Sequence, residues 1–237
     1  MFRNILLTAF LQLTIGAPAA AQDFPYPFQG LATDMAMNAL HSSVLNSMLP
    51  QDDAPSAAAS APAVETRYRA MPSVSAKAQR QFIAFIEQTS GKAGAEAVKK
   101  EFSKTSPTQL WANKVADEGL KPGDAVDAIA GYWMLNWIIA NTAHDSNFDT
   151  KPVLNQVRQV LSRDAGFRAM TQAQRQELSE VLMMNFLIQL AVYEDAVSTG
   201  NTLMLAQLAD AAVARFRNEA SVDLRALKVT QRGFAPR

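Results

Sequence analysis

The chain has 237 residues, with 22 lysines and arginines against 22 aspartates and glutamates, and it contains no cysteine. The formal net charge is zero. Nucleic-acid-binding proteins usually carry an excess of basic residues that neutralise phosphates, so we expect no nucleic-acid partner. Without a thiol the chain cannot form disulfides, thiolate zinc sites or a cysteine nucleophile, so a folded domain must be held by apolar burial.

The start of the chain has the pattern of a secretory signal peptide over residues 1–21. Arg3 supplies a short positive region, an apolar stretch runs over 5–15, and three alanines precede Gln22. The apolar stretch is shorter than the roughly 20 residues that span a bilayer, so we expect no transmembrane span in the mature chain. The protein would be exported, to the periplasm or, as the alternative, to the medium. Loss of Arg3 would leave a formal charge of −1.

Residues 22–72 differ in composition from the rest of the chain. Their second half is rich in alanine and serine and contains Pro50, Pro55, Pro62 and Pro72. This composition predicts a flexible linker, because proline removes backbone donors and small side chains bury little area. Ahead of it, apolar residues recur at spacings of two to four and predict an amphipathic helix at 30–48. That helix could dock on its own domain or bind a partner.

Residues 73–237 show helical periodicity and are expected to form one all-α domain of about seven helices. Five of these helices are predicted near 75–90, 92–102, 106–119, 150–161 and 201–216. Ser106 and Asn201 are the expected N-caps of two of them, because their short polar side chains accept backbone N–H groups. After residue 219 the apolar residues alternate, which predicts a short extended tail pinned by Phe234.

Two further helices, at 122–142 and 171–198, are the most apolar in the chain. The middle of the first contains one polar side chain, Asn136, and the middle of the second contains only Asn185 and Gln189. A helix that is apolar on all sides is normally buried, so these two are expected to form the centre of the domain.

Aromatic and amide side chains on the two central helices are the candidate binding residues. The set consists of Tyr132, Trp133, Asn136, Trp137, Asn185 and Gln189. The aromatic members could line a pocket for a sugar or an apolar ligand, or could simply fill the core, because such rings bury large areas. The amides could form a polar ligand site, or a structural network that fixes how the helices pack.

The sequence offers no cofactor motif and no convincing metal site. Only His41 and His144 are present, too few for a site built on histidine pairs. Residues 145–149 copy the opening of a calcium loop, but Thr150 stands where the turn glycine belongs and Gln156 where the bidentate glutamate belongs. We therefore expect neither a metal nor a cofactor.

The catalytic patterns are equally sparse. No Gly-x-Ser-x-Gly elbow is present. Carboxylate pairs are recognised by their separation in space, so the best-placed acids, Glu194 and Asp195, leave an envelope hydrolase open as the alternative. The absence of a concentrated polar constellation favours a non-enzymatic binding or interaction protein of the cell envelope, with an envelope protein or a small ligand as its partner.

Two stretches of the chain resemble a family of uncharacterised bacterial exported proteins. Residues 125–137 read Ala-Val-Asp-Ala-Ile-Ala-Gly-Tyr-Trp-Met-Leu-Asn-Trp, and residues 227–234 read Leu-Lys-Val-Thr-Gln-Arg-Gly-Phe. They match an Asp-x-x-x-x-Tyr-Trp-x-x-x-Trp helix and a Leu-x-x-Thr-x-x-Gly-Phe tail, with Val229 where leucine is expected. The resemblance covers residues 68–234. It implies a shared helical domain behind a signal peptide and a boundary near Tyr68, and it carries no activity.

Overall fold

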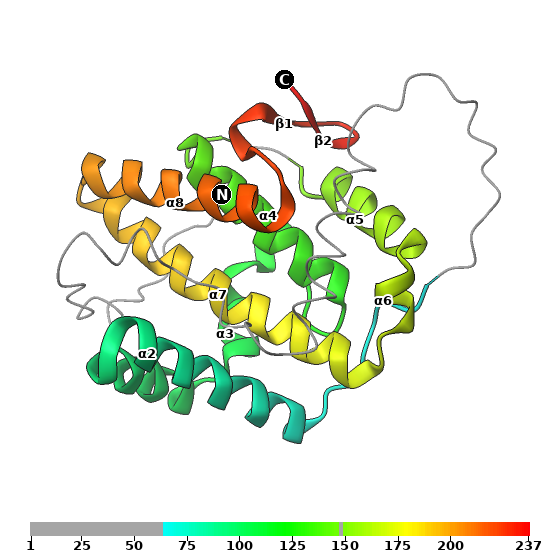
Figure 1. The fold of residues 1–237 in the computed structure, drawn as a ribbon, viewed down its shortest axis with the longest axis vertical. Coiled ribbons are helices and arrows are strands. Elements are labelled where there is room, and N and C mark those ends of the chain that lie inside the picture. Colours follow the sequence, from blue (N-terminus) through cyan, green and yellow to red (C-terminus); the bar gives the residue numbers. More distant parts are fainter. Residues whose placement is uncertain (1–63, 147–148) are drawn as a thin grey trace.

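The computed structural model describes residues 64–146 and 149–237 (Figure 1). The predicted fold class is confirmed, because seven α-helices and one small hairpin make up the described chain. The predicted signal peptide, linker and 30–48 helix lie outside the described residues, as do residues 147–148 of the calcium-like loop.

The elements follow one another with short connections. In chain order they are α2 (Pro72–Lys104), α3 (Pro107–Lys114), η2 (Ala116–Glu118), α4 (Ala125–Asn141), α5 (Lys151–Arg163), α6 (Ala165–Ala169), α7 (Gln172–Ser198), α8 (Thr202–Ala220), η3 (Leu224–Ala226), β1 (Leu227–Thr230) and β2 (Gly233–Pro236).

Local capping sets most of the helix starts, as expected. The side chains of Ser106, Thr171 and Asn201 accept the backbone N–H of Gln109, Gln174 and Met204, respectively. These bonds satisfy donors that the first turn of a helix leaves without an intrahelical partner.

The break expected at Gly91, between helices at 75–90 and 92–102, is confirmed, because Gly91 interrupts α2 with φ 78° and ψ 172°, outside helical geometry. Two other features differ from the prediction. The third helix ends early, because α3 stops at Lys114 and η2 follows it before Gly119. The short α6, capped by Asp164, was not predicted.

The expected start of the first central helix at Pro122 is wrong. Asp124 is the N-cap of α4, and its carboxylate accepts the backbone N–H of Val126 at 3.0 Å. The turn before it is held by residues 64–71, because Thr66 and Gly123 accept backbone N–H groups from Ala125 and Tyr68. The helix therefore begins where tertiary contacts fix the preceding turn.

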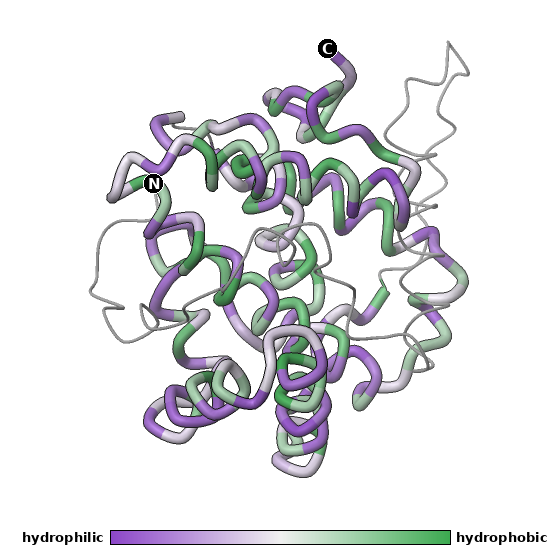
Figure 2. Tube along the Cα trace, turned by 60° about the vertical axis from the view of Figure 1, so that its left-hand side comes forward, coloured by the Kyte–Doolittle hydropathy of each residue, from purple (hydrophilic) through white to green (hydrophobic). Residues whose placement is uncertain are grey.

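The two predicted central helices do lie at the centre. Every residue of α4 from Ala125 to Ala140 is buried. It packs against α7, which also contacts α2 and α3, while α5 lies beside α4 and α8 contacts both central helices (Figure 1). Hydrophobic residues gather inside this arrangement and hydrophilic ones on the outside (Figure 2).

Within the described residues, α7 is the one helix long and apolar enough to cross a membrane. Core helices of soluble proteins pass the same test, and 61% of its most apolar window is buried inside the fold. The central position of α7 accounts for its hydropathy.

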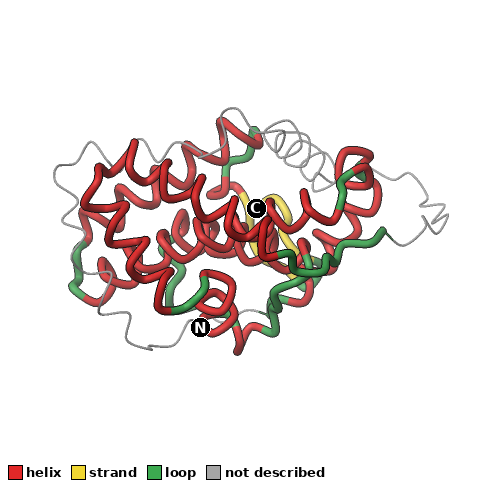
Figure 3. Tube along the Cα trace, turned by 90° about the horizontal axis from the view of Figure 1, so that it is seen from below, coloured by secondary structure: helices red, strands yellow, loops and turns green. Residues whose placement is uncertain are grey.

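The predicted extended tail is the first strand of a hairpin. The strands β1 and β2 pair antiparallel, with Val229 opposite Phe234, and they form the one sheet of the described chain (Figure 3). The side-chain amide of Gln156 on α5 accepts the N–H of Phe234 at 2.7 Å and donates to its carbonyl at 2.9 Å. Gln156 thus occupies the outer edge of β2 as a neighbouring strand would.

Candidate binding groove

The aromatic candidates on α4 lie in the core. Tyr132 and Trp133 are each 1% exposed, and both contact Phe216 on α8, with ring centroids 5.9 and 4.8 Å apart. Trp137 donates its indole N–H to the carbonyl of Leu227 at 3.0 Å. This placement supports the core-packing interpretation over an aromatic pocket.

Phe234 joins the two stretches that carry the family resemblance. Its ring lies 6.1 Å from the ring of Trp133 and 6.4 Å from that of Trp137, measured between centroids. The helix motif and the tail motif therefore form one packed unit.

The three amide candidates have different surroundings. Asn136 is fully buried, donates to the carbonyl of Tyr132 and accepts a hydrogen bond from Arg215 at 2.8 Å. Asn185 donates to the carbonyl of Val181 one turn earlier. Gln189 is 8% exposed, and its buried Oε1 has no hydrogen-bond partner within the described chain. Among the described residues the three amides do not hydrogen-bond to one another, and Asn136 bonds to Arg215 instead.

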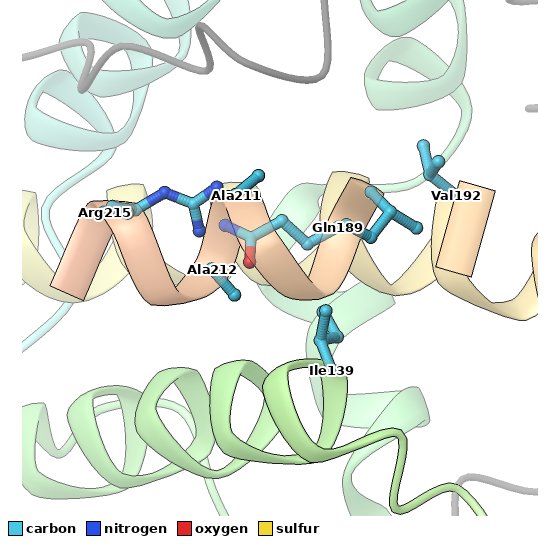
Figure 4. A pocket seen from close by; sticks show the side chains of 7 residues that line it. Ile139, Gln189, Val192, Ala211, Ala212 and Arg215 are labelled. Atoms are coloured by element: carbon cyan, nitrogen blue, oxygen red, sulfur yellow. The ribbon is translucent and has the colours of Figure 1, made fainter. Parts of the chain in front are cut away.

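A groove forms where α8 lies over α4 and α7 (Figure 4). Its lining residues are Ile139 on α4, Gln189 and Val192 on α7, and Leu208, Ala211, Ala212 and Arg215 on α8. Apart from Gln189 and Arg215 the lining is aliphatic. Leu208 and Ala211 in this lining are half-buried, whereas Ala212 is buried.

Arg215 places positive charge at this groove. A guanidinium stays protonated at physiological pH and offers five N–H donors. One donor reaches the neutral amide of Asn136, and among the described side chains no carboxylate forms an ion pair with Arg215. Figure 4 shows the side-chain nitrogen of Gln189 nearest to Arg215, with the side-chain oxygen pointing toward Ala212. The groove therefore combines aliphatic walls with one cation.

Sequence reasoning missed Arg215, although a signal was present. Arg215 follows Leu208 and Ala211 at i+7 and i+4, so it interrupts the apolar stripe of α8 with a charge. Its partner Asn136 is 79 residues away in the chain, so the pairing itself has no local signal.

A second polar cluster, also missed, fastens the start of the domain to α7. Gln176 is fully buried, and its side chain bonds both the N–H and the carbonyl of Met71 and donates to Glu180 at 2.8 Å. Ser75 also donates to Glu180, at 2.7 Å. Burial, together with the charge of Glu180, raises the pKa of the Tyr68 hydroxyl to about 12. These contacts form a packed junction and line no groove that the structure describes.

A pair of acids lies at the start of α4. Asp124 caps the helix and accepts a hydrogen bond from Arg158 at 3.2 Å, while Asp127 accepts the backbone N–H of Lys121 at 2.8 Å. Burial, and to a smaller degree the charge of Asp124, raises the pKa of Asp127 above its usual 3.8. Both carboxylates hold the turn before α4 in place.

Replacing Asp127 with asparagine should change how stability depends on pH. The native protein holds the Asp127 proton more tightly than the unfolded chain does. Proton binding at Asp127 therefore adds to the free energy of unfolding. This contribution is fully present below pH 3.8 and is lost as the pH rises through the pKa of Asp127 in the native protein. Asp127→Asn removes this titration, so its free energy of unfolding should rise relative to the wild type over that interval. Urea unfolding at a series of pH values measures the difference.

Asp223 provides a control of opposite sign. The hydrogen bond from Arg217 lowers the pKa of Asp223. The contribution of the Asp223 carboxylate to the free energy of unfolding is therefore present above pH 3.8 and is lost as the pH falls through the native pKa of this residue. Asp223→Asn should therefore lose stability relative to the wild type as the pH rises. If the free energy of unfolding of both variants followed the same pH dependence as that of the wild type, the pKa shifts assigned to Asp127 and Asp223 would both be wrong.

The fold and the groove define a class: an all-helical domain, closed by a C-terminal hairpin, with a small aliphatic groove that contains an arginine. Residues 2–234 match a family of unknown function, DUF6683, and the chain belongs to that family. No curated protein and no solved structure matches the chain.

Proposed function

We propose that this is an exported, non-enzymatic binding protein of the cell envelope, and that the groove between α4, α7 and α8 is its binding site. The observation that carries the proposal is Arg215, a cation that has no ion-pair partner among the described side chains and lies in an aliphatic groove. Its remaining N–H groups could pair with an anionic group of a ligand.

The start of the chain supports the location. The charged, apolar and small-residue segments of 1–21 are typical of a cleaved signal peptide. Periplasmic residence is the proposed destination, with secretion as the alternative.

The paired-carboxylate hydrolase is supported less well. Such an enzyme needs two acids facing a cleft that holds the substrate. Glu194, one of the two acids considered for this role, contacts Lys114 at 2.9 Å, and the oxygens of Asp124 and Asp127 accept backbone N–H groups. None of these acids lines the groove.

Filling the groove tests the proposed site. Ala211 is half-buried in the lining, so an Ala211→Trp indole should occupy the aliphatic space. We expect the mature chain to bind the neutral fluorescent probe N-phenyl-1-naphthylamine, and Ala211→Trp to weaken that binding about tenfold or more, equivalent to about 1.4 kcal/mol. Fluorescence titration measures the affinity.

Ala214→Trp is the matched control, because residue 214 is exposed on the same helix and outside the groove. It should bind the probe as the wild type does. Equal binding by all three proteins, or none by the wild type, would contradict the proposed site.

A further inference from the structure

One side of α8 is apolar but only half-buried. Met204, Leu208 and Ala211 follow one another at intervals of four and three residues, so they share one side of the helix, and Arg215 continues the row. Val192 of α7 lies beside this row and is also half-buried. These five residues are the α7–α8 face. Within the described chain α8 packs against α4, α7 and η3, and these contacts leave the face partly open to solvent.

A segment of the same chain carries the complementary charge. Residues 22–63 contain four aspartates and no lysine or arginine, whereas residues 64–237 contain 21 bases and 18 acids. The formal charges are therefore −4 and +3, and opposite charges attract. Asp34 is the one acid of the predicted 30–48 helix, and Arg215 has no ion-pair partner among the described side chains. A carboxylate is the natural partner for this guanidinium.

The predicted helix at 30–48 also has an apolar side of the right length. Leu40, Val44 and Met48 recur every four residues, so they share one side of that helix, and Asp34 falls at the edge of the same side. A helix of this length extends about 28 Å, whereas the α7–α8 face extends about 17 Å along α8. The segment is therefore long enough to cover the whole face.

The connection between the segment and the domain permits this contact. Residues 49–63 form the connection, and a flexible chain of that length spans about 20 Å on average and about 50 Å when extended. The chain enters the domain beside Asp124, where Arg67 pairs with it, and α4 covers the remaining distance of about 25 Å to the groove. The family match over residues 2–234 includes the segment, so the segment belongs to the region that the family shares.

We propose that residues 30–48 bind the α7–α8 face of their own chain, with Asp34 beside Arg215, and thereby cover the groove. The contact buries the apolar sides of both partners, which is favourable in proportion to the area removed from water. Its regulatory effect rests on the proposed function, because a ligand must displace the segment and its anionic group must replace Asp34. The affinity of the groove is then reduced by the fraction of molecules in which it is covered.

A single engineered thiol tests the contact, because the chain contains no cysteine. Ala211→Cys places a thiol within the α7–α8 face, and Ala206→Cys places one on the exposed side of α8. In a chain of residues 22–237, the Ala211→Cys thiol should react with N-ethylmaleimide about tenfold more slowly than it does when Leu40→Asp and Val44→Asp are added, because only uncovered molecules react. The Ala206→Cys thiol should react at the same rate in both backgrounds.

Ser43→Asp with Asn46→Asp is the matched control for the segment. It adds the same two charges on the opposite side of the predicted helix, so the Ala211→Cys thiol should remain protected. Failure of this pair to protect would show that added charge, and not loss of the apolar side, exposes the thiol.

Asp34→Lys tests the assigned ion pair. It should raise the reaction rate of the Ala211→Cys thiol about threefold, the effect of one exposed ion pair, whereas Asp23→Lys, the same charge change outside the predicted helix, should not. Adding Arg215→Gln should remove the difference between Asp34 and Asp34→Lys, because the pair no longer exists in either protein.

Equal rates for the Ala211→Cys thiol with the native segment and with Leu40→Asp and Val44→Asp would overturn this inference. Protection that disappears on dilution would also overturn it, because the occupant would then be a second copy, whereas a contact within one chain does not depend on concentration. The rates are measured without ligand. Failure here therefore leaves the probe test of the proposed function intact, and failure of that probe test leaves these rates unchanged.

Discussion

Replacement of Trp133 by alanine should lower the free energy of unfolding by about 3–5 kcal/mol, the usual cost of truncating a large buried aromatic side chain. The ring is 1% exposed and packs edge-on against Phe216, so its loss opens a cavity at the contact between α4 and α8. It also removes one of the two rings that flank Phe234. Chemical denaturation followed by circular dichroism measures the change.

Leu203→Ala is the matching control. The Leu203 side chain is 70% exposed near the start of α8, so truncation should change stability by no more than about 0.5 kcal/mol. A Trp133→Ala protein that melts like the wild type would show that α4 does not lie at the centre.

Gly233→Ala should cost about 2–4 kcal/mol. Gly233 has φ +101°, a conformation that alanine adopts only with strain. A Cβ there would lie 2.2 Å from Oε1 of Gln156, which would have to move and release both hydrogen bonds to Phe234. Urea unfolding measures the loss.

Gly119→Ala separates the two causes. Gly119 has φ +73°, and no atom lies within 4 Å of the site of a Cβ, so only the backbone strain applies. We expect it to cost about 1–2 kcal/mol. An equal loss in the two variants would mean that Gln156 contributes nothing to holding the hairpin.

The helices that sequence alone predicted well are those with a local start signal. Ser106, Thr171 and Asn201 each bond to a backbone N–H three residues later, so the information lies within one turn. The start of α4 failed because Pro122 and Asp124 are both plausible start residues. The choice between them depends on residues 64–71, far away in the sequence.

The candidate site was predicted only in part for the same reason. The periodicity of the central helices singled out Asn136 and Gln189, and both lie at or beside the groove. Arg215 and Gln176 were missed, since their partners Asn136 and Met71 are about eighty to a hundred residues away. Helical pattern tells which face is apolar, but not which polar group will meet another across the core.

The packing of Phe234 against Trp133 and Trp137 has a consequence for biosynthesis. This ring follows Trp133 and Trp137 by about a hundred residues in the sequence, so the ribosome supplies it long after them. Until then both indoles lack this one packing partner, and the nascent domain cannot reach its final packing. During that interval the growing chain exposes apolar surface of its central helix and is prone to aggregate.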